Sequence, residues 1–216
     1  MGTILSAYNV AQNRPRAEMG VSKESLAVLT LYHAPGSSSM AAHIALHEVG
    51  VPFEARALSF ARRETREPWF LAINPAGKVP VLVIDGRPLT EVAGILWYLA
   101  KRYPDRRLLE VDEAWAVSWM SFLASTVHAA RVKGAEAAQA AWQLAEARLD
   151  GAHWALGRYS IVDIHLFRLF WRYCGAASPS ATDLPALTAH YARMMERDAV
   201  RRTIAAEAAI GYQLPA

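Results

Sequence analysis

Strand patterns in this chain are confined to the segment before residue 91. Short β-prone apolar runs occur at three places, residues 26–32, 53–58 and 79–84. The dipeptide Asp85-Gly86 follows the third run and is a two-residue hairpin signal, so it predicts a fourth strand antiparallel to the third. Amphipathic helical patterns separate these strands. The order predicts a small mixed four-stranded sheet with helices packed on it.

Beyond Asp105 the strand patterns stop. Five Ala-rich amphipathic stretches follow, at residues 112–132, 135–149, 161–173, 184–195 and 199–209. Ser160 and Asp163 form a capping box, which predicts that the third of these helices begins after Ser160. We therefore expect an α/β domain over residues 28–104 and an all-α domain over residues 111–210. Residues 1–27 have no apolar period, and we expect a flexible tail there.

Composition excludes several classes of protein. Hydrophobic residues make up 53% of the 216 and charged residues 20%, so the chain is neither disordered nor fibrous. A net charge of +3 gives no reason to expect nucleic-acid binding, and no apolar run is long enough to predict a membrane span. The single cysteine, Cys174, forms no internal disulfide; we expect it to pack in the interior and the protein to be cytoplasmic.

Four segments carry a resemblance to a known family: residues 35–44, 74–82, 89–91 and 159–163. In this order they are similar to the glutathione S-transferase family, and most similar to its bacterial, beta-like branch. The resemblance extends from about Leu29 to Glu207. It implies a thioredoxin-like N-terminal domain, a C-terminal helical-bundle domain and a homodimer. It also implies a detoxification reaction, in which glutathione is added to a small hydrophobic electrophile.

The resemblance assigns glutathione contacts to several positions. It implies a cis Val79-Pro80 bond that exposes the backbone of Val79 to the cysteinyl part of glutathione. Lys78, Glu91 and Val92 would hold the charged ends of the tripeptide, and a helix beginning near Glu91 is by itself suited to anions. Many family members have a serine where this chain has Val92. Ser121 is a weaker candidate contact.

Three side chains could activate the glutathione thiol. Ser38 stands where beta-like members have a cysteine, so it can donate a hydrogen bond to the thiolate but cannot form a mixed disulfide. A plain helix N-cap is the alternative interpretation of Ser38. Tyr32 is a competing hydroxyl or a core aromatic residue. His128 resembles a histidine that faces the thiol in beta-like members, although a lone histidine on an apolar helix is more often structural.

Two other functions remain open at this stage, the first because Val92 departs from the family pattern and the second because it would use the same binding site. The fold could serve as a non-catalytic binding or regulatory protein, or the site could act as a glutathione-dependent disulfide reductase or peroxidase. No metal is expected: His43 and His47 have the i, i+4 spacing of metal ligands but no third ligand nearby in the sequence, which favours a solvated helix face. The region between His128 and Tyr159 is short for the family and predicts an open electrophile site.

Overall fold

The computed structural model describes residues 27–177, 179 and 182–212, and within them it confirms the predicted fold class. The first half of this part holds four strands, three α-helices and two short 3-10 turns. In chain order they are β1 (Leu29–His33), α2 (Ser39–Val49), β2 (Glu54–Ala57), η1 (Glu64–Arg66), α3 (Pro68–Ile73), β3 (Val81–Ile84), β4 (Arg87–Thr90), α4 (Val92–Arg102) and η2 (Pro104–Arg106). The predicted tail falls almost wholly on residues outside the described part.

The four strands form one mixed sheet in the order β2-β1-β3-β4. Strand β1 pairs parallel with β2 and antiparallel with β3, and Tyr32 lies opposite Val81 in the second pairing. The hairpin predicted at Asp85-Gly86 joins β3 to β4 with Ile84 opposite Arg87. Both turn residues have positive φ, 48° and 80°, as a two-residue turn of the favoured hand requires.

Within the described residues, every regular element of the second half is a helix. Its elements are α5 (Glu113–Phe122), η3 (Leu123–Val127), α6 (His128–Ala130), η4 (Arg131–Lys133), α7 (Ala135–Leu149), α8 (Ile161–Ala177), α9 (Pro185–Met195) and α10 (Asp198–Ile210). The capping box at the start of α8 is confirmed. The amide of Val162 donates to Ser160 Oγ at 3.2 Å, and the amide of Ser160 donates to Asp163 Oδ2 at 2.9 Å.

The helix predicted over residues 112–132 is not uniform. Residues 123–127 form a π-helical segment in which the amide of His128 donates to the carbonyl of Leu123, five residues earlier. Ser125 Oγ donates to the carbonyl of Ser121 at 2.8 Å, a local bond that competes with the regular α-helical pattern. Such segments rotate the residues that follow them around the helix axis, here those from His128 onward.

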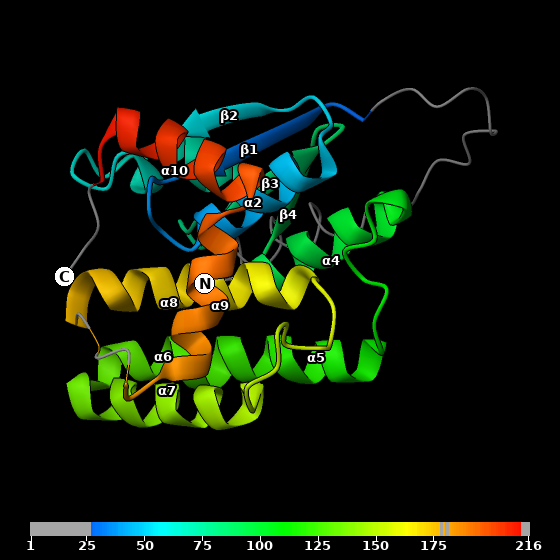
Figure 1. Cartoon of the computed structure of the whole chain (residues 1–216). Coiled ribbons are helices and arrows are strands. Elements are labelled where there is room, and N and C mark those ends of the chain that lie inside the picture. Colours follow the sequence, from blue (N-terminus) through cyan, green and yellow to red (C-terminus); the bar gives the residue numbers. More distant parts are fainter. Residues whose placement is uncertain (1–26, 178, 180–181, 213–216) are drawn as a thin grey trace.

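Helix α10 crosses back from the helical half and packs beside α2, against the N-terminal half (Figure 1). This packing contradicts the expectation that His43 and His47 lie on a solvated face. His43 is buried at 3% exposure, and His47 is partly buried. The sequence did not indicate that the last helix returns to cover α2. The domain boundary proposed between residues 104 and 111 stays a prediction.

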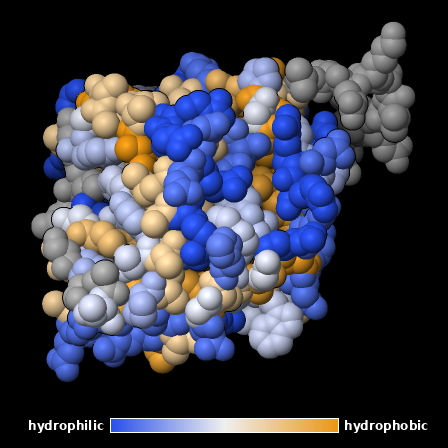
Figure 2. Space-filling model, viewed as in Figure 1, coloured by the Kyte–Doolittle hydropathy of each residue, from blue (hydrophilic) through white to orange (hydrophobic). Residues whose placement is uncertain are grey.

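The main hydrophobic core joins the two halves. Leu96 and Leu99 of α4 belong to the same buried cluster as Ile164 and Phe167 of α8. Cys174 packs against this cluster, in keeping with a packing role. On the face shown in Figure 2, hydrophilic side chains are widespread and the hydrophobic ones gather in patches between them. None of the helices within the described residues is both long and apolar enough to span a membrane.

Candidate functional site

A cavity of about 500 Å³ lies between the two halves of the molecule. The N-terminal half supplies four parts of its wall: the start of α2, Phe60, the loop before β3 and the start of α4. The helical half supplies Ala124, His128 and His165. Polar groups from five separate chain segments therefore converge on one hollow, which is the usual form of a small-molecule site.

Three consecutive serines, Ser37 and Ser38 before α2 and Ser39 at its first position, make different contacts. Ser37 and Ser39 are buried and bonded to each other, with 2.7 Å between their Oγ atoms. Ser39 Oγ also donates to the carbonyl of Ala34, and Ser37 Oγ accepts from the amide of Ser39. Ser38 occupies the N-cap position without making a cap bond, so its interpretation as a plain N-cap is wrong. Its hydroxyl lines the cavity and donates to the carbonyl of Val79 at 3.1 Å.

The loop before β3 presents its backbone to the cavity. The Val79-Pro80 bond is cis, as the resemblance implied. Buried Asn74 holds the loop in shape, because its Nδ2 donates to the carbonyl of Lys78 at 2.7 Å and its Oδ1 accepts from the amide of Ala76. Lys78, Val79 and Pro80 all line the cavity. The sequence marked this loop as a turn but gave no indication that the Asn74 side chain organises it.

The N-terminus of α4 forms a further part of the cavity wall, through Glu91, Val92 and Ala93. Glu91 has φ 68° and ψ 126°, a conformation that non-glycine residues rarely adopt. Its side chain makes no cap bond to the helix. Such backbone strain, which costs about 1–3 kcal/mol, gathers at ligand sites. The exposed helix amides and the positive dipole end favour an anionic group here.

Two histidines of the helical half lie at the cavity. Burial lowers the pKa of His128, and Arg168, Arg131 and Lys78 lower it further. Burial also lowers the pKa of His165, to about 3, with added repulsion from Arg168 and His128. Both imidazoles are therefore neutral at pH 7. His165 Nδ1 is buried without a hydrogen-bond partner.

The structure brings together most of the residues proposed from the sequence but leaves two outside. Ser38, Lys78, Val79, Pro80, Glu91, Val92 and His128 all line the cavity. Tyr32 is not among the lining residues: its ring packs on Trp69 and Phe70, and its hydroxyl accepts from Arg56 at 3.2 Å. It takes the alternative role of a core aromatic residue. Ser121 is exposed and also absent from the lining.

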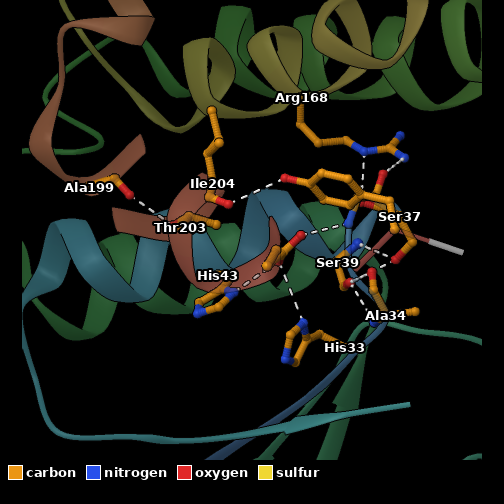
Figure 3. A network of polar contacts seen from close by, with 12 residues as sticks. His33, Ala34, Ser37, Ser39, His43, Arg168, Ala199, Thr203 and Ile204 are labelled. Carbon is orange, nitrogen blue, oxygen red and sulfur yellow. Dashed lines mark hydrogen bonds and ion pairs between the residues drawn. The ribbon is translucent and has the colours of Figure 1, made fainter. Parts of the chain in front are cut away.

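Arg168 of α8 holds the loop over residues 36–39 from the helical half (Figure 3), and Glu207 of α10 also binds this loop. The sequence analysis missed both residues. Arg168 Nε donates to the carbonyl of Ser37 at 2.8 Å, and its Nη2 donates to that of Gly36 at 3.1 Å. Glu207 Oε2 accepts from the amide of Gly36 at 2.6 Å, and Oε1 lies 2.9 Å from Nδ1 of His43. A charged residue inside the apolar run 161–170 was the available signal for Arg168.

Glu207 also changes the metal argument drawn from the sequence. It joins His33 and His43 in a buried group whose potential metal-binding atoms all lie within 4.8 Å of one another. His43 therefore has two further residues beside it that could bind a metal, neither of which is close in the sequence. Both oxygens of Glu207 already accept hydrogen bonds from Gly36 and His43. We interpret the group as a hydrogen-bonded tie between α10, α2 and β1.

A thioredoxin-like sheet joined to a helical half, with a cavity between them lined by a cis-proline loop, defines the class of protein. Residues 27–101 match the family model described as glutathione S-transferase, N-terminal domain. The chain is 31% identical over 201 residues to glutathione S-transferase GstA of Escherichia coli O157:H7, across 83% of this chain and 98% of that one. The chain belongs to the glutathione S-transferase family.

Two solved structures extend the similarity to three dimensions. A sphingomonad glutathione S-transferase complexed with glutathione is 33% identical, with a TM-score of 0.73 over 83% of this chain and 98% of that one. The bacterial beta class glutathione S-transferase of Sphingomonas chungbukensis is also 33% identical, with a TM-score of 0.73 over 82% and 98%. The likeness therefore spans both halves.

Proposed function

We propose that the protein is a glutathione transferase that binds glutathione in the cavity, stabilises its thiolate and adds it to a hydrophobic electrophile. One observation carries the proposal: the Ser38 hydroxyl, the backbone of Val79 and the N-terminus of α4 line the same cavity. The Ser38 hydroxyl suits a thiolate, the backbone of Val79 suits another peptide backbone, and the N-terminus of α4 suits a carboxylate. Glutathione is a tripeptide that offers all three.

Glutathione would lie across the loop before β3. The backbone of Val79 would pair with the cysteinyl residue, and the amides at the start of α4 would hold the γ-glutamyl carboxylate. Glu91 would bind the ammonium group of the same residue, and the Lys78 ammonium adds positive charge at the wall. These contacts would place the sulfur near Ser38.

Ser38 would stabilise the thiolate. A free thiol has a pKa near 8.5, and lowering it by two units requires about 2.7 kcal/mol. One hydrogen bond to a charged partner supplies about 1.5–3 kcal/mol. The Ser38 hydroxyl would leave the Val79 carbonyl and donate to sulfur instead. Neutral His128 on the opposite wall adds no positive charge at pH 7, so we assign it a positioning role.

The reaction then balances without a redox step. The thiol loses its proton to solvent, the thiolate forms a carbon–sulfur bond, and a halide or similar leaving group departs with its electron pair. We also propose a homodimer in the cytoplasm, in keeping with the family resemblance and the single half-buried cysteine. Sedimentation of the purified protein tests the dimer.

The test combines glutathione calorimetry with a pH series of conjugation rates. We expect Ser38→Ala to keep most of the glutathione affinity, to raise the apparent pKa of the bound thiol by about one unit or more, and to slow turnover below that pKa about tenfold. Ser118→Ala is the matched control, because Ser118 is exposed and lies outside the cavity.

Three results would count against the proposal or redirect it. Absent glutathione binding, with one stoichiometric protein partner recovered, would favour the non-catalytic alternative. Turnover of disulfides or peroxides without conjugation would favour the reductase or peroxidase. Unchanged kinetics in Ser38→Ala would move thiolate stabilisation away from this hydroxyl.

A further inference from the structure

A second cavity of about 540 Å³ opens beside the first, within the helical half. Its wall comes from the segment around α6 and η4, from α7 and from α8. His128 lines both cavities, so the two adjoin at this residue. A smaller hollow of about 140 Å³ carries Ser38 together with three arginines of the second cavity. A molecule in the second cavity would therefore extend towards the Ser38 hydroxyl.

Two kinds of side chain define the second cavity. Trp142 and Tyr173 supply aromatic surface, with their ring centroids 5.3 Å apart. Arg131, Arg168 and Arg172 supply three guanidinium groups. Among the lining residues that the structure describes for this cavity and the smaller hollow, none is an aspartate or a glutamate. Apolar aromatic surface thus meets concentrated positive charge.

The three guanidinium groups repel one another. The pKa of Arg168 is lowered to about 9, mainly by burial and then by the charges of Arg172 and Arg131, although Glu207 acts in the opposite direction. Burial and Arg131 likewise lower the pKa of Arg172. Arg168 donates hydrogen bonds to the uncharged carbonyls of Ser37 and Gly36. An anion in this place would relieve the repulsion, since a nearby opposite charge stabilises each guanidinium.

The charged ends of glutathione do not account for the cluster of three arginines. Lys78, Glu91 and the start of α4 line the first cavity and not the second, whereas the three arginines line the second and not the first. The groups suited to the charged ends of glutathione are therefore separate from the arginine cluster. What remains for the arginines is the acceptor that the thiolate attacks.

We propose that the acceptor substrate is an aromatic electrophile that carries a negative charge, such as a carboxylate or a sulfonate. Its ring would lie against Trp142 and Tyr173, its charge would face Arg131 and Arg172, and its reactive carbon would point to Ser38. This inference rests on the proposed function, because it names the acceptor for the same reaction.

The test compares two acceptors of similar shape, one charged and one neutral: 4-chloro-3-nitrobenzoate and 4-chloro-3-nitrobenzamide. In both, the thiolate forms a carbon–sulfur bond, the carbon–chlorine bond breaks and chloride leaves with its electron pair. We expect kcat/KM for the benzoate to exceed that for the benzamide by about tenfold, even though the carboxylate activates the ring less. Raising the salt concentration should reduce this ratio.

Variants of the arginines test whether they cause the preference for the benzoate. We expect Arg131→Gln and Arg172→Gln each to reduce the benzoate preference about three- to tenfold through the KM of the acceptor, while the KM of glutathione stays near wild type. Arg201→Gln, at an exposed position of α10 outside both cavities, is the matched control. A rise in the KM of glutathione instead would assign the arginines to the tripeptide and overturn the inference.

Direct binding separates this inference from the proposed function. Quenching of tryptophan fluorescence by 3-nitrobenzoate and 3-nitrobenzamide, measured without glutathione, reports binding of the aromatic compound independently of conjugation, and Trp142 lines the second cavity. Tighter binding of the benzoate that weakens in Arg131→Gln supports the inference even if no conjugation occurs. Equal binding of the two compounds, together with normal conjugation of the benzamide, would overturn the inference and leave the proposed function intact.

Discussion

Glu207 near the end of the chain lies 2.9 Å from Nδ1 of His43, 164 residues earlier. Its other oxygen accepts from the amide of Gly36, two residues before Ser38. Glu207 itself is fully buried. The last helix therefore fixes the loop that presents the proposed thiolate donor, so the position of Ser38 depends on a residue outside the N-terminal half.

Replacing Glu207 tests this dependence. Burial alone would raise the pKa of Glu207, but the contacts with His33, His43 and Gly36 outweigh it and hold the pKa below its ordinary value. We expect Glu207→Gln to lower the free energy of unfolding at pH 7 by about 2–4 kcal/mol, because a buried charged network is broken. Urea denaturation followed by circular dichroism measures the change.

The pH dependence of the same variant follows from the sign of the shift. A carboxyl group with a depressed pKa stabilises the folded state above its unfolded pKa, near 4.3, and loses that contribution as the pH falls through the folded value. The difference in the free energy of unfolding between wild type and Glu207→Gln should therefore become smaller at acidic pH. Glu196→Gln, exposed at the end of α9, is the control. Equal urea midpoints for Glu207→Gln and Glu196→Gln at pH 7 would show that the hydrogen-bonded tie between α10, α2 and β1 does not stabilise the fold.

Local patterns predicted the elements of this fold well. Asp85-Gly86 defined a hairpin, and the capping box at Ser160 marked the start of α8, because both signals act over a few residues. The resemblance, and not the patterns, indicated the cis bond at Val79-Pro80.

Long-range packing was not predictable in the same way. His43 was expected on a solvated face, yet α10 covers it, and no feature of α2 itself reports that contact. Similarly, Ser37, Ser38 and Ser39 are alike in sequence, and only the carbonyls of Ala34 and Val79 decide which hydroxyl turns inward and which faces the cavity. Tyr32 and Ser121 failed to reach the cavity for the same reason, since packing sets the direction of a side chain.

Gly77 provides a test of the loop that presents Val79. Its φ is +60°, and a Cβ at this position would lie 2.7 Å from Arg66 Nη1 and 2.8 Å from the carbonyl oxygen of Thr65. The Thr65 contact is with backbone, so the loop must shift. We expect Gly77→Ala to weaken glutathione binding about tenfold or more, measured by calorimetry.

The control for Gly77→Ala is Gly86→Ala. Gly86 also has a positive φ, +80°, but an added Cβ would meet nothing within 4 Å. Its replacement should cost about 1–2 kcal/mol of stability from backbone strain and leave glutathione affinity near wild type. Matching losses of affinity in the two variants would mean that general destabilisation, and not the shape of the loop, controls binding.

His165 should make the protein sensitive to acid. Its pKa of about 3 lies far below the value of 6.5 expected for the unfolded chain, mainly because it is buried. Between these two values the unfolded chain binds a proton that the folded protein does not. The free energy of unfolding is therefore not reduced by His165 above pH 6.5, and it decreases as the pH falls from 6.5 towards 3.

Removing this histidine should flatten the dependence of stability on pH. We expect His165→Gln to reduce the slope of the unfolding free energy between about pH 6 and 4 by up to about 1.4 kcal/mol per pH unit, whatever its stability at pH 7. Urea titrations at several pH values give the slope. His153→Gln, at an exposed position before α8, controls for loss of a histidine in general. A slope in His165→Gln equal to that of the control would show that His165 is not the group that resists protonation in the fold.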